Sequence, residues 1–151
     1  MDSHLIESKL KSQELFRGSF LHAFRDTVAL PDGSEASREY VIHPGAVMIV
    51  PLLELPGQPL QLVMERQFRY PVQQVMLEFP AGTLDPGETP LSTMERELQE
   101  AAGYSASRWD ALGAMLPCPG YSDEVIHLFL ARELSPLAEP PAGDDDEEEE
   151  E

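Results

Sequence analysis

The sequence is poor in cysteine, in basic residues and in long apolar runs, and each shortage excludes a class of protein. It contains one cysteine, Cys118, so a disulfide within the chain and zinc frameworks built on several cysteines are excluded. Only 10 of its 151 residues are lysine or arginine, against 28 aspartates and glutamates. A chain so poor in basic residues lacks the clustered positive charge that binding to a nucleic-acid backbone requires.

Long apolar runs are also missing. The longest, near residues 45–53, is too short to cross a bilayer, and no stretch has the pattern of a signal peptide. We therefore expect a cytoplasmic protein with neither a membrane nor a nucleic acid as partner. The length fits one domain, and a hydrophobic content of 42% is enough for a core.

The net charge of −18 is unevenly distributed along the chain. Asp144–Glu151 supplies eight acids, so residues 1–143 carry −10, from 10 basic and 20 acidic side chains. A segment rich in proline and alanine precedes this run. Taken alone, such a run is typical of a solvated tail. We therefore separate residues 135–151 as an acidic loop or tail.

A glycine-containing loop followed by a short amphipathic helix carries the chemistry. The loop is Gly82–Glu88, and seven residues later come Arg96, Glu97 and, in the same helix, Glu100. Because helical residues three and four apart share a face, Glu97, Glu100 and position 101 point the same way. Carboxylates grouped in this way suit Mg²⁺, which also takes waters and substrate phosphate as ligands. Such a metal neutralises phosphate charge and lowers the pKa of a bound water.

This segment resembles the signature of the Nudix hydrolases, G-x5-E-x7-R-E-U-x-E-E-x-G-U, where U is a bulky apolar residue. The matching positions are Gly82, Glu88, Arg96, Glu97, Leu98, Glu100, Gly103 and Tyr104. The resemblance implies an α/β fold, the Nudix α/β/α sandwich with a mixed β-sheet, and Mg²⁺ or Mn²⁺ as the cofactor. It also implies that Glu97, Glu100 and the backbone carbonyl of Ala81 hold the metal, and that Arg96 joins the two glutamates in the catalytic group.

One position departs from the signature. Ala101 stands where the second glutamate of the E-E pair belongs. In the family that glutamate is a direct metal ligand, and the alanine side chain has no oxygen to offer. Since alanine is the best helix former, we expect the fold to be kept. We expect turnover to be weak or absent, lowered by roughly 10³-fold or more through the missing ligand.

Residues outside this signature resemble the ADP-ribose pyrophosphatases in particular. The run Gln67-Phe68-Arg69-Tyr70 looks like their Q-Y-R strand, and residues 77–82 look like their L-E-x-P-A-G approach to the loop. By this likeness Arg69, Glu78 and Gly82 bind substrate. The run 119–124 looks like their P-G-x-S-x-E loop, which adds Glu124. The implied reaction is Mg²⁺-dependent hydrolysis of the diphosphate in ADP-ribose, giving AMP and ribose 5-phosphate.

The acidic run also has a counterpart in those enzymes. There, an acidic loop contributes a glutamate near the metal-bound water, and a strand and a C-terminal helix follow it. This sequence has the acids of Asp144–Glu151 and lacks the usual strand and helix after them. A carboxylate from this run is therefore a candidate for positioning the attacking water.

Patterns along the chain predict three segments: an N-terminal β-hairpin unit at 1–44, a Nudix domain at 45–134, and the acidic segment at 135–151. A turn at 31–34 joins the hairpin's strands at 13–30 and 38–42. Further strands are expected at 46–53, 61–69, 75–79, 111–116 and 125–132, with a helix at 90–102. Because so small a hairpin buries little by itself, and the resembling enzymes use such a unit to pair, we expect a homodimer.

Two other functions fit the same residues. One is a Nudix hydrolase of another nucleoside diphosphate sugar, such as a GDP- or ADP-hexose, which shares the signature and differs in the pocket. The other is a catalytically silent module that binds a nucleotide sugar without cleaving it, an interpretation that Ala101 favours. A weaker hypothesis is that the acidic segment recruits a basic protein.

Overall fold

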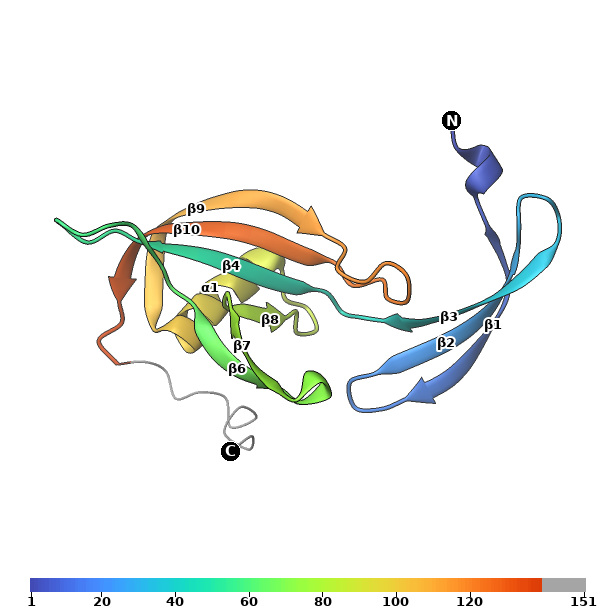
Figure 1. The fold of residues 1–151 in the computed structure, drawn as a ribbon, viewed down its shortest axis with the longest axis horizontal. Coiled ribbons are helices and arrows are strands. Elements are labelled where there is room, and N and C mark those ends of the chain that lie inside the picture. The colour runs from blue at the N-terminus through green and yellow to red at the C-terminus, as the bar shows by residue number, and fades with distance from the viewer. Residues whose placement is uncertain (140–151) are drawn as a thin grey trace. The chain divides into compact units, whose positions relative to one another are not determined.

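The computed structural model describes residues 1–139, which fall into two compact units (Figure 1). The first unit contains Met1–His43 together with Leu116–Val125. The second contains Pro44–Met115 and the described residues from Ile126 onward. No helix among residues 1–139 has the length and apolarity needed to span a bilayer.

The first unit is a three-stranded antiparallel sheet in the order β1-β2-β3. Its elements are a short 3₁₀ turn Ser3–Leu5, β1 Ser8–Arg17, β2 His22–Ala29 and β3 Glu35–Ile42. The predicted turn joins β2 to β3, where Gly33 has a φ of 87° and the Asp32 carboxylate accepts the Ser34 N–H at 2.9 Å. The turn and the pairing of β2 with β3 confirm a hairpin here. The strand expected at 13–30 is wrong as a single strand, because a turn in which the Gly18 N–H donates to the Leu21 carbonyl divides it into β1 and β2.

The sequence pattern did not predict β1 as a separate strand. Its pairing with β2 shifts register between Lys9 and Lys11 and again between Glu14 and Phe16. Each shift breaks the alternation of apolar and polar residues that identifies a strand in a sequence.

The loop Leu116–Val125 is fixed to the end of β3. The Val41 N–H donates to the Tyr121 carbonyl at 2.8 Å, and the His43 N–H donates to Asp123 Oδ1 at 2.7 Å. An isolated parallel bridge also joins Val41 to Ser122. This loop lies between two strands of the second unit in the sequence, yet its hydrogen bonds make it part of the first unit.

The second unit is built on a mixed sheet in the order β5-β4-β10-β9, with β8 paired to β4. Strand β10 is parallel to β4 and antiparallel to β9. The elements are β4 Ala46–Leu53, β5 Gln61–Leu62, β8 Ala81–Thr83, β9 Tyr104–Met115 and β10 Ile126–Pro136. A separate two-stranded sheet consists of β6 Glu65–Arg69 and β7 Gln74–Glu78, joined by the 3₁₀ turn Tyr70–Val72.

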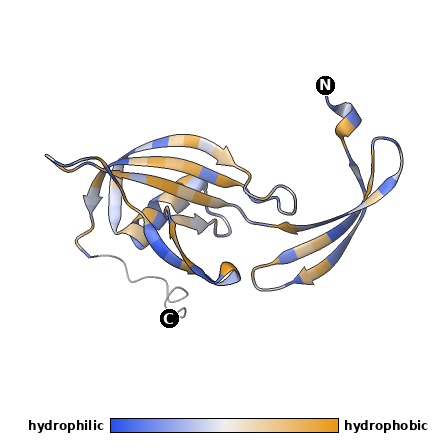
Figure 2. Ribbon diagram, viewed as in Figure 1, coloured by the Kyte–Doolittle hydropathy of each residue, from blue (hydrophilic) through white to orange (hydrophobic). Residues whose placement is uncertain are grey.

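Helix α1, Pro90–Ala102, has the predicted bounds and is the one α-helix of residues 1–139. Thr89 caps it, Pro90 opens its first turn, and Gly103 ends it with a φ of 70°. Its buried Met94 and Leu98 pack on the strands, and Figure 2 shows hydrophobic residues running along β4 and β10. The buried core consists of Val47, Ile49, Met94, Leu98 and Ala131.

The main differences from the predicted strands of the second unit are the following. The strand expected at 61–69 is divided into β5 and β6, and the predicted loop at Ala81 forms the short strand β8. Strand β9 begins at Tyr104, directly after the helix, rather than at 111. The polar first half of β9 pairs with the C-terminal half of β10. The hydrogen bonds to this partner strand stabilise a strand that the local sequence pattern does not predict.

Candidate active site

The loop and helix of the signature meet at Gly82 and Glu97. Glu97 is only 9% exposed, although it is a glutamate. A Cβ added at Gly82 would lie 1.9 Å from Glu97 Oε1 and 2.0 Å from its Cδ. Glycine is therefore required here for space, since strand β8 passes directly over the carboxylate. The substrate contact predicted for Gly82 stays a prediction beside this packing role.

The guanidinium of Arg96 lies at the centre of the acidic residues. Its Nη1 is 3.1 Å from Glu97 Oε1 and donates to Glu100 Oε2 at 3.1 Å. Its Nη2 donates to Glu88 Oε2 at 3.2 Å and is 3.4 Å from Asp85 Oδ2. The sequence analysis places Arg96 in the catalytic group with Glu97 and Glu100, and the structure brings this arginine against the loop and both helical glutamates.

This network changes two pKa values in opposite directions. Partial burial disfavours the charge of Arg96, but the Glu88 hydrogen bond, the Glu97 charge and the Glu100 hydrogen bond outweigh burial and raise its pKa. The hydrogen bond from Thr93, followed by that from Arg96, lowers the pKa of Glu88. Both shifts favour the charged forms, so the ion pairs persist at neutral pH.

Thr93 is a member of the site that the sequence analysis did not identify. It is fully buried in α1, and its hydroxyl donates to Glu88 Oε2 and lies 3.0 Å from the Thr89 carbonyl. The signal in the sequence was its spacing, because Thr93 is one helical turn before Glu97 and on the same face. A hydroxyl on the buried face of a helix needs a partner, and here Glu88 is that partner.

Strand β8 presents the carbonyl of Ala81 away from the sheet. Hydrogen bonds join Leu84 N–H to the Gly45 carbonyl and Ile49 N–H to the Pro80 carbonyl, each at 2.9 Å. Because hydrogen-bonded and non-hydrogen-bonded pairs alternate along an antiparallel ladder, Ala81, opposite Met48, is at a non-hydrogen-bonded position. Its carbonyl oxygen is thus oriented away from β4, as a ligand to a bound cation requires.

These donors fit a divalent cation in part. Glu97 and Glu100 offer carboxylate oxygens and Ala81 a carbonyl, which are the hard ligands that Mg²⁺ prefers. Position 101 adds none, and within residues 1–139 no group of three or more His, Cys, Asp or Glu side chains is arranged to hold a metal ion. The donor set suits a cation that takes most of its ligands from water and phosphate.

The structure also brings together two of the predicted substrate-binding residues. Arg69 at the end of β6 and Glu78 at the end of β7 form a bidentate pair, in which Nη2 donates to Glu78 Oε2 at 2.7 Å. The Arg69 Nε donates to both carboxylate oxygens, at 3.1 and 3.2 Å. Glu78 therefore orients the Arg69 guanidinium.

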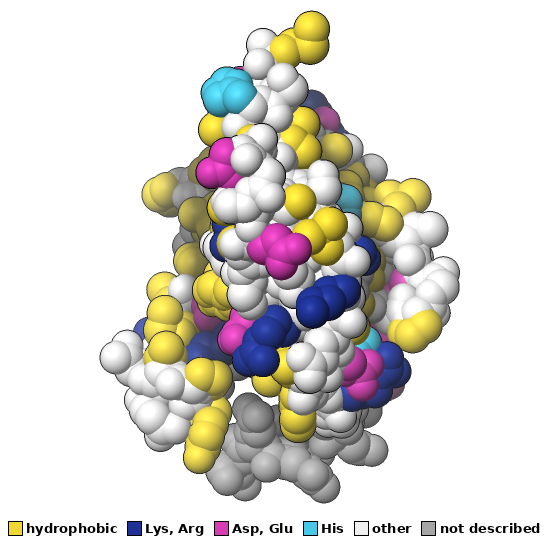
Figure 3. Space-filling model, turned by 90° about the vertical axis from the view of Figure 1, so that its right-hand side faces the viewer, with side chains coloured by type: hydrophobic (Ala, Val, Ile, Leu, Met, Phe, Trp, Pro, Cys, Tyr) yellow, Lys and Arg dark blue, Asp and Glu magenta, His cyan; other side chains and the backbone are white. Residues whose placement is uncertain are grey.

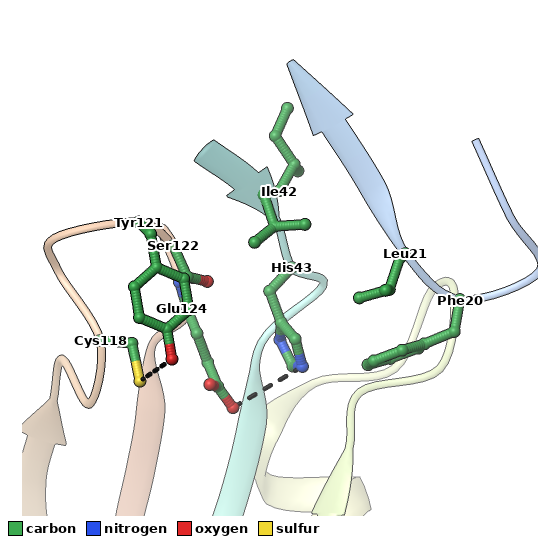
Figure 4. Close-up of a pocket in the computed structure, with 9 residues that line it drawn as sticks. Phe20, Leu21, Ile42, His43, Cys118, Tyr121, Ser122 and Glu124 are labelled. Carbon is green, nitrogen blue, oxygen red and sulfur yellow. Dashed lines mark hydrogen bonds and ion pairs between the residues drawn. The ribbon is translucent and has the colours of Figure 1, made fainter. Parts of the chain in front are cut away.

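Glu124 belongs to the first unit and borders a cavity of about 160 Å³ there (Figure 4). Its Oε1 is 3.6 Å from His43 Nε2, and the His43 ring meets Phe20 edge-on at 5.6 Å. Tyr121 donates its hydroxyl hydrogen to the Cys118 sulfur at 3.2 Å. The cavity thus combines an imidazole–carboxylate pair with largely apolar walls. It is lined by Phe20, Leu21, Val41, Ile42, His43, Cys118, Tyr121, Ser122 and Glu124.

Cys118 lies in the loop Leu116–Val125 of the first unit. Trp109 lies in β9 and packs against the core of the second unit. The carboxylates of Asp144–Glu151, among which the sequence analysis placed a group for positioning water, lie outside the described residues.

Two families of domain match this sequence. Residues 42–151 match the NUDIX domain, and residues 7–41 match the nucleoside diphosphate sugar hydrolase N-terminal domain. The ADP-ribose pyrophosphatase of Bacillus subtilis (strain 168) is 38% identical over 135 residues, 89% of this chain and 71% of the relative. The methanol dehydrogenase activator of Bacillus methanolicus is 37% identical over 129 residues, 85% of this chain and 68% of that protein.

A solved structure shares the fold. The crystal structure of an ADP compounds hydrolase superposes with a TM-score of 0.76 at 23% sequence identity, covering 91% of this chain and 74% of that one. At this identity the likeness concerns the fold, the mixed sheet with its helix and the N-terminal antiparallel strands, which the sequence analysis predicted.

Proposed function

Since this chain belongs to the Nudix hydrolase family and is a pyrophosphohydrolase of that family, we propose that its substrate is ADP-ribose. The reaction is hydrolysis of the diphosphate, giving AMP and ribose 5-phosphate. The observation that carries this choice is the 38% identity to an ADP-ribose pyrophosphatase over 89% of the chain. The match of residues 7–41 to the N-terminal domain of nucleoside diphosphate sugar hydrolases supports the same substrate class.

The members of this family use a divalent metal, which we propose to be Mg²⁺, with Mn²⁺ as a substitute. Glu97, Glu100 and the Ala81 carbonyl would hold it, and it would supply charge neutralisation at the diphosphate and a water of lowered pKa. Arg96 fixes the position of both glutamates through its two contacts at 3.1 Å. Gly82 leaves the space that the Glu97 carboxylate occupies.

We assign substrate contacts to residues outside this cluster. Arg69, oriented by Glu78, would offset the negative charge of the diphosphate. Glu124 is a further proposed substrate contact, carried over from the likeness of residues 119–124 to the P-G-x-S-x-E loop. A carboxylate from Asp144–Glu151 positions the attacking water by general-base chemistry. Each of these roles is a proposal carried over from the sequence likeness.

We further propose a homodimer formed through the N-terminal sheet. Every residue of β1 is exposed in the single chain, and large apolar side chains are among them or near them. Leu10 is 53% exposed, Phe16 56% and Phe20 59%. On the face drawn in Figure 3, hydrophobic side chains lie exposed between charged ones. A second copy would cover such residues. The acidic composition disfavours a nucleic-acid partner, and a cytoplasmic location stays a prediction.

The test is AMP release from ADP-ribose with Mg²⁺, measured beside the Ala101→Glu variant. We expect the variant to be at least tenfold faster, because it restores a carboxylate at a metal-ligand position and the missing one costs roughly 10³-fold in rate. A panel of other nucleoside diphosphate sugars decides the substrate. If Ala101→Glu gains less than tenfold, the role assigned to position 101 is wrong.

Ala101 also favours a second function, a module that binds nucleotide sugars without cleaving them. Two carboxylates already paired with one arginine make a poor site for a metal of their own. Tight ADP-ribose binding that is unaffected by Mg²⁺, with no AMP released by the chain, would establish this function instead.

A further inference from the structure

We propose that this chain holds its divalent cation only together with the substrate's diphosphate, which supplies the ligands that the protein lacks. The inference rests on the proposed function, because it concerns the cation and the diphosphate of that reaction. It says that the cation and the substrate bind as a pair, each strengthening the affinity of the other.

The first argument is the number of protein donors. Magnesium demands near-octahedral coordination and keeps several waters unless stronger ligands replace them. Glu97, Glu100 and the Ala81 carbonyl are the donors proposed for the cation, and position 101 contributes no oxygen. Glu88 does not replace the missing carboxylate, because its Oε2 accepts hydrogen bonds from both Thr93 and Arg96.

The second argument is the charge already present. The Arg96 Nη1 is within 3.1 Å of Glu97 Oε1 and of Glu100 Oε2, so both carboxylates have a cationic partner before any metal arrives. A cation arriving alone must lose hydration and share carboxylates that are already neutralised in part. A diphosphate brings oxygen ligands to replace the lost waters and negative charge to balance the cation.

The third argument is that the Glu97 carboxylate is held in a fixed position. Glu97 is 9% exposed and is confined beneath Gly82, where a single added carbon would overlap its oxygen. The site therefore keeps one firmly positioned ligand on which a cation–diphosphate pair can dock. The protein supplies the position, and the substrate supplies most of the remaining coordination.

The experiment is a calorimetric titration of Mn²⁺ into the full chain, alone and with saturating α,β-methylene ADP-ribose. We expect the analogue to tighten Mn²⁺ binding at least tenfold and, by reciprocity, Mn²⁺ to tighten binding of the analogue by the same factor. In Ala101→Glu, Mn²⁺ alone should bind at least tenfold more tightly than in the unchanged chain, and the analogue should add less. The exposed Glu95 of the same helix supplies the charge control, Glu95→Gln, which should change neither value.

Two results would overturn the inference. One is an Mn²⁺ affinity that is the same with and without the analogue, and the other is Mn²⁺ alone binding as tightly to this chain as to Ala101→Glu. If α,β-methylene ADP-ribose does not bind at all, the proposed substrate is wrong, and α,β-methylene-ADP, which carries the same diphosphate, replaces it. No gain in Mn²⁺ affinity with either compound overturns the inference independently of the substrate.

Deleting residues 144–151 tests whether the acidic run supplies a metal ligand in place of position 101. If Mn²⁺ alone binds tightly to the full chain and weakly to the deletion variant, that ligand belongs to the acidic run.

Discussion

Gly82→Ala is the substitution for which the structure gives the clearest expectation. The backbone at Gly82 is not among the positive-φ positions, so the main chain accepts alanine. The side chain does not fit, because its Cβ would lie 1.9 Å from Glu97 Oε1 and 2.6 Å from Oε2. The carboxylate is buried, so either it or strand β8 must move. Forcing one carbon into a closely packed site costs about 1–3 kcal/mol.

Urea unfolding followed by the fluorescence of Trp109 measures this cost. Trp109 is the single tryptophan and packs against the core of the second unit, so its signal reports the unit that contains Gly82. We expect a lower midpoint for Gly82→Ala with an unchanged slope. Thr83→Ala is the control, since Thr83 is an exposed residue of the same strand β8, and it should lower the midpoint less.

A double-mutant cycle with Glu97→Ala identifies the cause. Once the Glu97 carboxylate is removed, the added methyl group has room, so Gly82→Ala should be nearly neutral in that background. The coupling energy should then be about 1–3 kcal/mol, which lies well above the additivity expected of independent sites. Equal effects of Gly82→Ala in both backgrounds would refute the reasoning, because the glycine would then serve something other than the space of Glu97.

Two further substitutions test contacts that the sequence analysis did not identify. Thr93→Val should lower the urea midpoint at pH 7, whereas Thr93→Ser should keep it. The Thr93 hydroxyl lowers the pKa of Glu88 in the folded state. Its contribution to stability is therefore present above the unfolded-state pKa of Glu88 and disappears as the pH falls through the folded-state pKa. A difference between Val and Ser that persists unchanged in acid would exclude the Glu88 contact as its source. Asp123→Ala removes the acceptor of the His43 N–H and should raise the KM for ADP-ribose several-fold, because it frees the loop that contains Glu124. Asp123→Asn keeps the Oδ1 acceptor and should leave the KM unchanged. Equal KM values for the two variants would show that the loop does not depend on this hydrogen bond.

The helix and its acidic face could be predicted because their causes are local. Thr89, Pro90 and Gly103 fix the ends of α1 through capping and backbone preference, and helical periodicity alone brings Glu97 and Glu100 to one face. Arg96 is in the same turn, so its place beside these glutamates also follows from the helix alone. Each of these inferences uses residues fewer than fifteen positions apart.

Contacts between distant segments could not be predicted in the same way. The bond between His43 and Asp123 joins residues 80 positions apart, and it is what makes the loop 116–125 part of the first unit. The pairing of Arg69 with Glu78 depends on the antiparallel register of β6 and β7, and the strands expected at 61–69 and 75–79 carried no register. The bulges of β1 hide its alternation, so its pairing with β2 shows only in the folded chain.

Ala101 has a consequence for stability that opposes its consequence for metal binding. Four carboxylates surround the Arg96 guanidinium, from Asp85, Glu88, Glu97 and Glu100. A glutamate at 101 would add a fifth, one helical turn after Glu97, where a like charge costs about 0.2–0.5 kcal/mol. Ala101→Glu should therefore lower the urea midpoint in the absence of metal. Saturating Mn²⁺ should more than restore it, since a ligand that binds only the folded state stabilises that state. A variant whose midpoint is unchanged with and without Mn²⁺ would show that position 101 does not share the electrostatic field of this cluster.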